Sequence, residues 1–155
     1  MKIVLDTNVL IAAHVARGLA HSVFELCLNE HTIILSSSIL KELANGLLKK
    51  IGQPPSIAGP IIEQLKRIAD IREPVPVPAG SCRDSGDLHV LGLAAAAGAD
   101  RIVTGDDDLL ALGSFRGIPI VSPREFWDER RRAKQTVHES PALPFRRPGR
   151  SKARK

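Results

Sequence analysis

Short apolar runs alternate along the chain with longer stretches whose apolar residues recur at helical spacing. The short runs are rich in β-branched residues, as is typical of buried strands, and they cover residues 3–5, 32–35, 102–104 and 118–121. The amphipathic or apolar helical stretches cover residues 9–15, 20–30, 36–50, 57–70, 87–97, 109–112 and 123–132. This alternation predicts an α/β fold in three layers, a central and mainly parallel sheet with helices on both faces.

Residue types at the ends of these segments support the assignment. Ser36, Ser37 and Ser38 are candidate N-caps for the helix that follows them, and Gly52 ends that helix. Residues 71–77 contain Pro74 and Pro76, so any strand there must lie at a sheet edge. The stretch 87–97 is nearly all apolar and rich in alanine, which predicts a helix packed closely on both sides.

Length and composition fit a single globular domain. The chain has 155 residues, of which 43% are hydrophobic and 25% charged. No apolar run approaches the roughly 20 residues of a membrane span, and the first run is interrupted at Asp6, so we expect neither a membrane segment nor a signal peptide. Two cysteines without a CxxC motif or a Cys/His cluster favour a reducing, cytoplasmic compartment and give no sign of a structural zinc site.

The net charge of +5 is distributed unevenly. Residues 130–155 hold ten Lys/Arg and one acid, whereas residues 1–129 hold twelve Lys/Arg and sixteen acids. We therefore predict a mildly acidic domain over residues 1–132 and a flexible basic tail over residues 133–155. The tail would bind RNA, contact an acidic surface of a partner or be a solvated appendage. Aromatic residues are scarce, at 3%, which disfavours a module that stacks single-stranded RNA bases.

Carboxylates recur where the chain leaves its predicted strands or begins a helix. Asp6 follows the first strand, Asp106 follows residues 102–104, Glu42 lies early in the helix after the second strand, and Asp87 opens the alanine-rich helix. The carboxyl ends of parallel strands share one sheet edge, so these acids should meet there. Carboxylate oxygens suit Mg²⁺ or Mn²⁺, which can support phosphodiester cleavage. The sequence contains no P-loop, GxGxxG, GxSxG or HExxH motif as an alternative.

Each acid also has a structural interpretation when it is taken singly. Asp6 could cap the next helix, and Glu42 could be a solvated helix residue. Asp84 and Asp87 could favour a helix N-terminus through its dipole. Asp108 is the expected N-cap of residues 109–112, and Asp107 is expected to be a solvated turn residue. Only the joint placement of the acids favours a site.

Three sequence segments resemble PIN-domain nucleases. They are LDTNVL at residues 5–10, CRDSGD at 82–87 with ADRIVTGDDDLL at 99–110, and FRGIPIVSPREF at 115–126. The resemblance spans roughly residues 1–130, and it implies a PIN-like fold. It is strongest where LDTNVL and TGDDDLL occur together, since either motif alone would be weakly specific.

The resemblance implies a Mg²⁺- or Mn²⁺-dependent endoribonuclease, closest to the VapC-like toxins of type II toxin–antitoxin pairs. It also implies an RNA substrate, a small antitoxin partner and a homodimer. By residue-by-residue comparison, the catalytic, metal-binding acids are Asp6, Glu42, Asp87 and Asp106. Asp108 matches an auxiliary metal ligand, and Asn8 and Thr104 match positions that orient ligands or water.

The chain departs from the family pattern in two places. Relatives often have two or three consecutive acids near Asp87, but Gly86 and Leu88 flank it here. The basic tail matches no family motif, and the acidic partner surface that it would contact is that of the antitoxin. Five histidines share no ligand spacing, and His89 is expected on another side of its helix than Asp87.

Other function classes are weaker. A phosphoacceptor signalling domain would need paired acids at the first strand and a lysine after the last, but Thr7 follows Asp6 and Ser122 follows the last strand. A non-catalytic PIN-like scaffold would be expected to lack acids of the set. The alternative is a PIN nuclease of RNA maturation or decay. Only the presence or absence of a neighbouring antitoxin gene would distinguish it from a toxin.

Overall fold

The structure, a computed structural model, describes residues 1–138 and contains one six-stranded sheet. The strands lie in the order β3-β2-β1-β4-β6-β5, and β5 alone runs antiparallel to its neighbour. Their bounds are β1 Lys2–Leu5, β2 Thr32–Leu35, β3 Asp70–Ile71, β4 Arg101–Val103, β5 Ser114–Phe115 and β6 Ile118–Val121.

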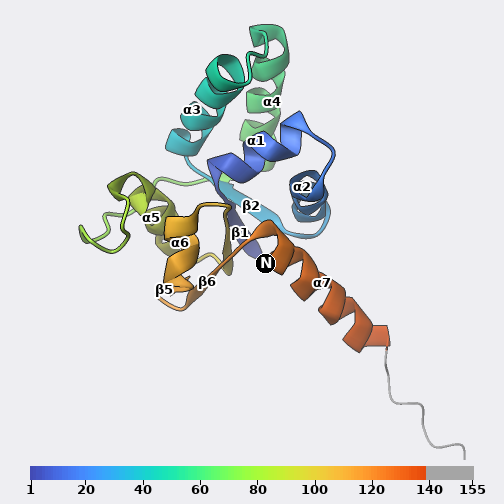
Figure 1. Cartoon of the computed structure of the whole chain (residues 1–155), viewed down its shortest axis with the longest axis vertical. Coiled ribbons are helices and arrows are strands. Elements are labelled where there is room, and N and C mark those ends of the chain that lie inside the picture. Colours follow the sequence, from blue (N-terminus) through green and yellow to red (C-terminus); the bar gives the residue numbers. More distant parts are fainter. Residues whose placement is uncertain (139–155) are drawn as a thin grey trace, which may run out of the picture.

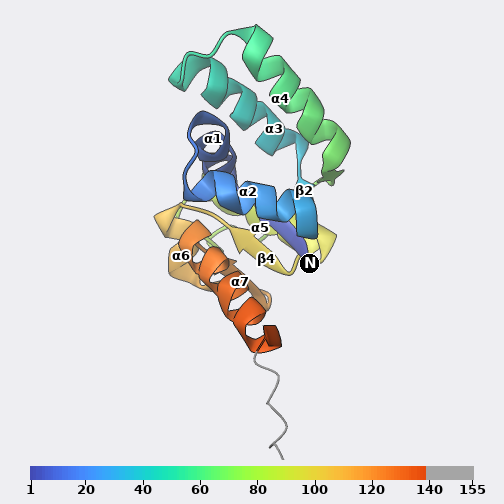
Figure 2. The ribbon, with the colours of Figure 1, turned by 90° about the vertical axis from the view of Figure 1, so that its right-hand side faces the viewer.

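Helices cover both faces of this sheet. They are α1 Thr7–Val15, α2 Leu19–Glu30, α3 Ser37–Asn45, α4 Pro55–Ile68, α5 Leu88–Ala97, α6 Asp107–Leu112 and α7 Pro123–His138, with a π-helical turn η1 Gly46–Lys50 and a 3₁₀ turn η2 Ser85–Asp87. Helices α1, α2 and α7 lie on one side of the strands and α5 and α6 on the other, while α3 and α4 project as a pair beyond β2 (Figures 1 and 2). The predicted α/β fold in three layers is confirmed.

The apolar strand sequences follow from this burial. Residues 3–5 and 33–35 are all buried, because α2 packs on β2 from one face while α5 packs on β1 and β2 from the other. A strand covered on both faces needs apolar residues at every position, which explains why the short runs do not alternate with polar residues.

Several elements differ from their predicted extents. The predicted edge strand over residues 71–77 forms only the two-residue β3, at the sheet edge as expected. The short strand β5 was not predicted, since two residues are too few to give a pattern. The predicted helix through Lys50 ends as the π-helical turn, in which Ile51 N donates to Gly46 O over 3.0 Å.

The last helix continues past the predicted end at Arg132 to His138, through the boundary that the sequence suggested between domain and tail. Tertiary contacts support the extension, because Arg130 and Lys134 both pair with Glu30 on α2. The remainder of the predicted tail, residues 139–155, lies outside the described residues.

Helix α5 is covered closely on both sides, as its alanine-rich sequence predicts. A Cβ at Gly92 would lie 2.2 Å from the carbonyl oxygen of Val75, and Val75 N donates to Gly92 O over 3.2 Å. Only glycine allows the extended segment after β3 to approach this closely. The packing fixes α5, whose N-terminal end carries Asp87.

Within residues 1–138, no single helix is both long and apolar enough to cross a membrane, although α1 and α2 would together meet that test across a bend of 105°.

Candidate active site

The strand order creates a site between β1 and β4. From β1 the chain moves outward to β2 on one side, and it later returns to form β4 on the other side. Ligands of open α/β sheets bind in the crevice at such a reversal, outside the carboxyl ends of the strands. Asp6 follows β1 and Asp106 follows β4, and Leu5 and Val103 are paired in register. Two predicted acids therefore lie at this crevice.

Asp6 is almost entirely buried, with 6% of its surface exposed, and its carboxylate accepts several hydrogen bonds. Thr7 N donates to Oδ1 over 2.8 Å, and Thr104 Oγ1 donates to Oδ2 over 2.8 Å. Asn8 Nδ2 also donates to Oδ2, over 3.3 Å. Asp6 is thus the N-cap of α1, as its structural interpretation suggested, and it is also held in a fixed orientation at the sheet edge.

The two polar residues predicted to orient ligands also connect the loops around Asp6. The Asn8 side chain accepts a hydrogen bond from Gly105 N over 3.1 Å, and Thr104 Oγ1 accepts one from Asp106 N over 3.0 Å. The loops after β1 and β4 are therefore joined by side chains that touch the Asp6 carboxylate. Their assignment as ligand-orienting residues stays a prediction.

Asp106, not Asp108, is the N-cap of α6. Its Oδ1 accepts hydrogen bonds from Asp108 N over 2.8 Å and Leu109 N over 3.3 Å. The sequence prediction of Asp108 was wrong because the helix begins two residues earlier, at Asp107, and a capping acceptor must precede the first turn. Both bonds fall on Oδ1, so Oδ2 accepts none within residues 1–138.

Asp87, unlike Asp106, does not use its carboxylate to cap a helix. Asp84 caps the 3₁₀ turn by accepting from Gly86 N over 2.9 Å, whereas Asp87 makes no capping bond. Its Oδ2 is buried and has no hydrogen-bond partner within residues 1–138. Buried polar atoms are rarely left unpaired, so an unpartnered carboxylate oxygen facing other acids suits a bound cation.

Burial and neighbouring charge disfavour ionised acids here. Burial, and after it the charge of nearby carboxylates with Asp106 foremost, together raise the pKa of Asp87 to about 6. Burial likewise raises the pKa of Asp6, against the opposing effect of its hydrogen bonds from Thr104 and Thr7. A divalent cation would relieve this repulsion.

Glu42 reaches the site from α3 and is the most exposed of the four acids that face it. About half of its side-chain surface, 49%, is accessible. Thr7 Oγ1 donates to Glu42 Oε2 over 2.8 Å, and His89 Nε2 lies 3.0 Å from Oε1. His89 was expected on a different side of α5 from Asp87. It nevertheless reaches the site, because Glu42 of α3 lies against it.

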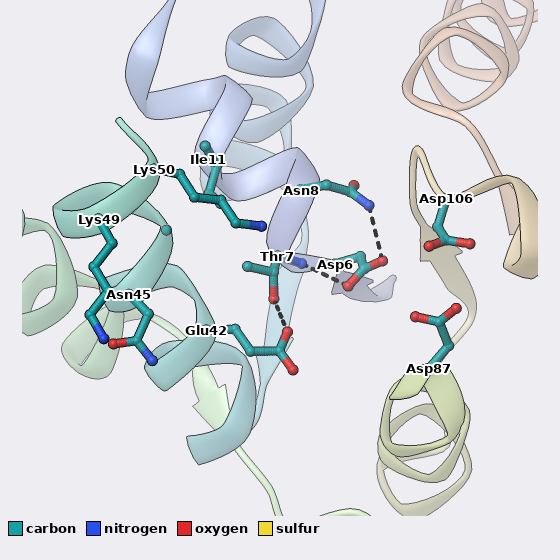
Figure 3. Close-up of a pocket in the computed structure, with 11 residues that line it drawn as sticks. Asp6, Thr7, Asn8, Ile11, Glu42, Asn45, Lys49, Lys50, Asp87 and Asp106 are labelled. Carbon is teal, nitrogen blue, oxygen red and sulfur yellow. Dashed lines mark hydrogen bonds between the residues drawn. The ribbon is translucent and has the colours of Figure 1, made fainter. Parts of the chain in front are cut away.

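The four predicted acids line one cavity of about 420 Å³. Figure 3 shows Asp6, Asp87 and Asp106 facing one another, with Glu42 and two lysines across from them. The lining residues are Asp6, Thr7, Asn8, Ile11, Glu42, Asn45, Gly46, Lys49, Lys50, Asp87 and Asp106. Asp107 is exposed and is not among them.

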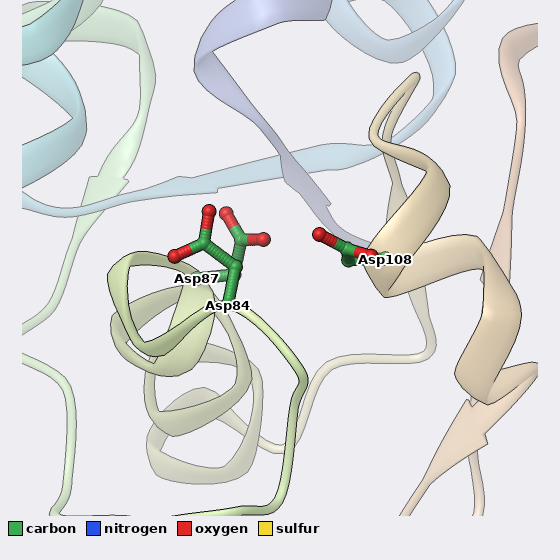
Figure 4. A group of neighbouring side chains, drawn as sticks. All are labelled: Asp84, Asp87 and Asp108. Carbon is green, nitrogen blue, oxygen red and sulfur yellow. The ribbon is translucent and has the colours of Figure 1, made fainter.

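Asp108 lies beside this cavity with two other acids. Carboxylate oxygens of Asp84, Asp87 and Asp108 come within 4.8 Å of one another (Figure 4). From the sequence, Asp84 was expected only to favour a helix N-terminus, and the capping bond that it accepts from Gly86 N fits that role. Asp108 stays a predicted auxiliary ligand, next to Asp87 rather than in the cavity lining.

Sequence patterns did not reveal the basic side of the cavity. Lys49 and Lys50 belong to the π-helical turn, which in sequence looks like the solvated end of a helix. A Cβ at Gly46 would lie 2.5 Å from Ile11 Cδ1, so the turn packs closely on α1. A glycine within an otherwise leucine- and lysine-rich helix is the only sequence signal that marked this contact.

Comparison with known proteins supports the architecture. The chain superposes with a TM-score of 0.56 on a chain in the crystal structure of VapBC2 from Rickettsia felis bound to a DNA fragment from their promoter, at 18% identity over 79% of this chain and 98% of that one. At this identity the likeness establishes the fold. No curated protein gives a sequence match.

The family model of the PIN domain matches residues 2–108, a span that contains LDTNVL, the first five residues of TGDDDLL and all four acids of the cavity. Because this match extends over more than half of the 155 residues and the fold agrees with it, the chain belongs to the PIN domain family.

Proposed function

We propose that this protein is a Mg²⁺- or Mn²⁺-dependent endoribonuclease that acts as the toxin of a type II toxin–antitoxin pair. The observation that carries the proposal is the convergence of carboxylates from four separate segments on one cavity, where Asp87 keeps a buried and unpartnered oxygen. The cavity lies at the sheet edge where α/β enzymes bind their ligands.

The acids that would hold the metal are Asp6, Glu42, Asp87 and Asp106, with Asp108 as an auxiliary ligand. An all-carboxylate donor set fits hard divalent cations. The bound ion would activate water and neutralise charge at the phosphodiester. Asn8 and Thr104 would keep Asp6 oriented, through the hydrogen bonds that they donate to its Oδ2.

A polyanionic substrate also needs positive charge near the acids. Residues 1–129 hold more acids than bases, yet Lys49 and Lys50 line the side of the cavity opposite Asp87 and Asp106, and the Lys50 amine extends toward the acids (Figure 3). We assign these lysines to the phosphates that flank the scissile bond, because lysine binds phosphate as a compact charge on a flexible stem.

The toxin assignment draws on the shared fold with a chain of VapBC2, whereas a PIN nuclease of RNA maturation would have the same site. An antitoxin partner and a homodimer belong to this proposal, as does a cytoplasmic location. A small reading frame directly beside this one, whose product binds the protein and blocks cleavage, separates the toxin from the maturation enzyme.

Cleavage of RNA should require a divalent ion. Incubation of the full chain with structured and single-stranded RNAs should give products carrying 5′-phosphates in Mg²⁺ or Mn²⁺ and none in EDTA, because the carboxylates alone supply no activated water. Restoration by added Mn²⁺ serves as the control for damage by the chelator. Cleavage that persists in EDTA would contradict the proposal.

Asp6→Asn and Asp106→Asn should each lower cleavage at least about 100-fold, since loss of groups that merely orient ligands already costs about 10–100-fold. Neither should lower the melting temperature of the metal-free protein by more than about 3 °C at pH 7. An amide oxygen still accepts the capping bonds. Because the pKa of Asp6 is raised in the folded protein, its ionisation lowers stability as the pH rises from the ordinary aspartate value of 3.8 through the raised pKa, and asparagine avoids this cost.

The matched variants Asp6→Ala and Asp106→Ala test whether capping is the only role of these residues. They remove the acceptor as well as the charge and should be less stable by about 1 kcal/mol, as lost N-caps are. Asparagine variants that keep both activity and stability would show that the residues are structural caps and nothing more.

Asp87→Ala should abolish cleavage while Asp107→Ala keeps activity within about twofold, the range of an ordinary surface substitution. Asp87 lines the cavity from the fixed end of α5, whereas Asp107 points into solvent from the first turn of α6. Single-turnover cleavage rates of the two variants provide the comparison. Equal losses would mean that the loop after β4 is used differently from this assignment.

The double variant Lys49→Ala/Lys50→Ala should bind single-stranded RNA more weakly and with a smaller salt dependence. Two lost phosphate contacts should reduce the slope of log affinity against log salt by about 1.4. Binding is measured in an Asp106→Asn background, which prevents cleavage. Lys66→Ala/Arg67→Ala removes the same charge from α4, away from the cavity lining, and is the matched control. Equal slopes for the two double variants would exclude the lysines as RNA contacts.

A further inference from the structure

Glu42 is the acid of the cavity with the longest and most exposed side chain. Asp6 and Asp106 are N-caps and use their carboxylates to bind backbone N–H groups of the helices that they begin. Glu42 instead lies within α3, on a longer side chain, and about half of that side chain is exposed. Rotamer freedom of this kind must be lost before a carboxylate can serve as a ligand.

Two side chains from different elements hold the Glu42 carboxylate, one at each oxygen. Thr7, at the start of α1, donates to Oε2 over 2.8 Å. His89, in the first turn of α5, places Nε2 3.0 Å from Oε1. The carboxylate is thus fixed from both sides, and its orientation depends on three helices that come together only in the folded protein.

We propose that His89 is a positioning residue that orients Glu42 for the metal site. This inference rests on the proposed function, because it takes Glu42 as a metal ligand. Partners that hydrogen-bond to ligating carboxylates fix their orientation, and their loss typically lowers metal affinity about 10–100-fold. No sequence motif noted above includes His89. Its role is inferred from the distance between its Nε2 and Glu42 Oε1.

The surroundings of the imidazole ring favour the tautomer that this task needs. His89 is mostly buried, with 23% of its side chain exposed, and its Nδ1 has no hydrogen-bond partner within residues 1–138. A proton on Nε2 would face Glu42 Oε1, 3.0 Å away, and leave Nδ1 as a lone pair. The opposite tautomer would bury an unpaired N–H at Nδ1 and turn a lone pair toward a carboxylate, which costs more.

His89 also connects two acids of the site through one rigid element. It lies two residues after Asp87, and both belong to the segment that α5 fixes against β1 and β2. Because His89 contacts Glu42, the position of Glu42 depends on the same helix that positions Asp87. Loss of the ring should therefore release Glu42 without displacing the other acids.

The test is Mn²⁺ affinity, measured by calorimetry on the full chain without RNA. His89→Ala should weaken Mn²⁺ binding about 10-fold or more. His89→Gln should recover most of the affinity, because its side-chain amide can donate to Glu42 Oε1 from a similar reach. In a Glu42→Gln background, His89→Ala should cause no further loss, since the ring then has no ligand to orient.

His21→Ala is the matched control. His21 forms an equivalent pair on α2, with Nε2 3.1 Å from Glu25 Oε1, and neither residue lines the cavity. This variant should bind Mn²⁺ as the wild-type protein does. Thermal melting in EDTA verifies that every variant is folded at the temperature of the titration.

The outcomes separate the inference from the proposed function. Unchanged Mn²⁺ affinity in His89→Ala, or an equal loss in His89→Ala and His89→Gln, would overturn the positioning role while leaving the nuclease intact. Wild-type protein that binds Mn²⁺ with the expected dependence on His89 but cleaves no RNA would support the positioning role and overturn the nuclease.

Discussion

The parallel pairing of β1 with β4 is the constraint on which the site depends. This register places the residues after Leu5 and Val103 side by side, and Asp6 N continues the ladder by donating to Val103 O over 3.0 Å. Both strands are buried on both faces, so a slip in register would move apolar residues out of the core. The hydrophobic core thereby fixes the separation of Asp6 from the loop that carries Asp106.

Assembling acids at one edge has an electrostatic cost, which the fold lowers by giving several of them backbone partners. Asp6 and Asp106 bind helix N-terminal N–H groups, where the helix dipole favours negative charge. Asp87 receives no such bond, and it is the acid whose pKa rises to about 6. The capping and ligand interpretations of these acids therefore coexist, and Asp87 is the group with the most to gain from a cation.

Two turns that are not α-helical supply residues at the periphery of the site. The π-helical turn after α3 presents Lys49 and Lys50, and the 3₁₀ turn before α5 presents Asp87 with its carboxylate free of capping bonds. Such turns often occur at functional sites because they alter which side chains face a cavity. The central strands supply a fixed frame, and these turns determine what surrounds it.

The layers of the fold and the four acids that line the cavity could be predicted from sequence patterns. Fully apolar strands, helical periodicity and acids after strand ends are local patterns, and parallel strands bring their carboxyl ends together in any fold of this class. The contact of His89 with Glu42 joins residues 47 positions apart, and Lys49 and Lys50 line the cavity from a π-helical turn that packs on α1. The continuation of α7 beyond Arg132 likewise accompanies the pairing of Lys134 with Glu30 of α2. Such pairings between distant segments leave no periodic signal, so only the tertiary structure decided them.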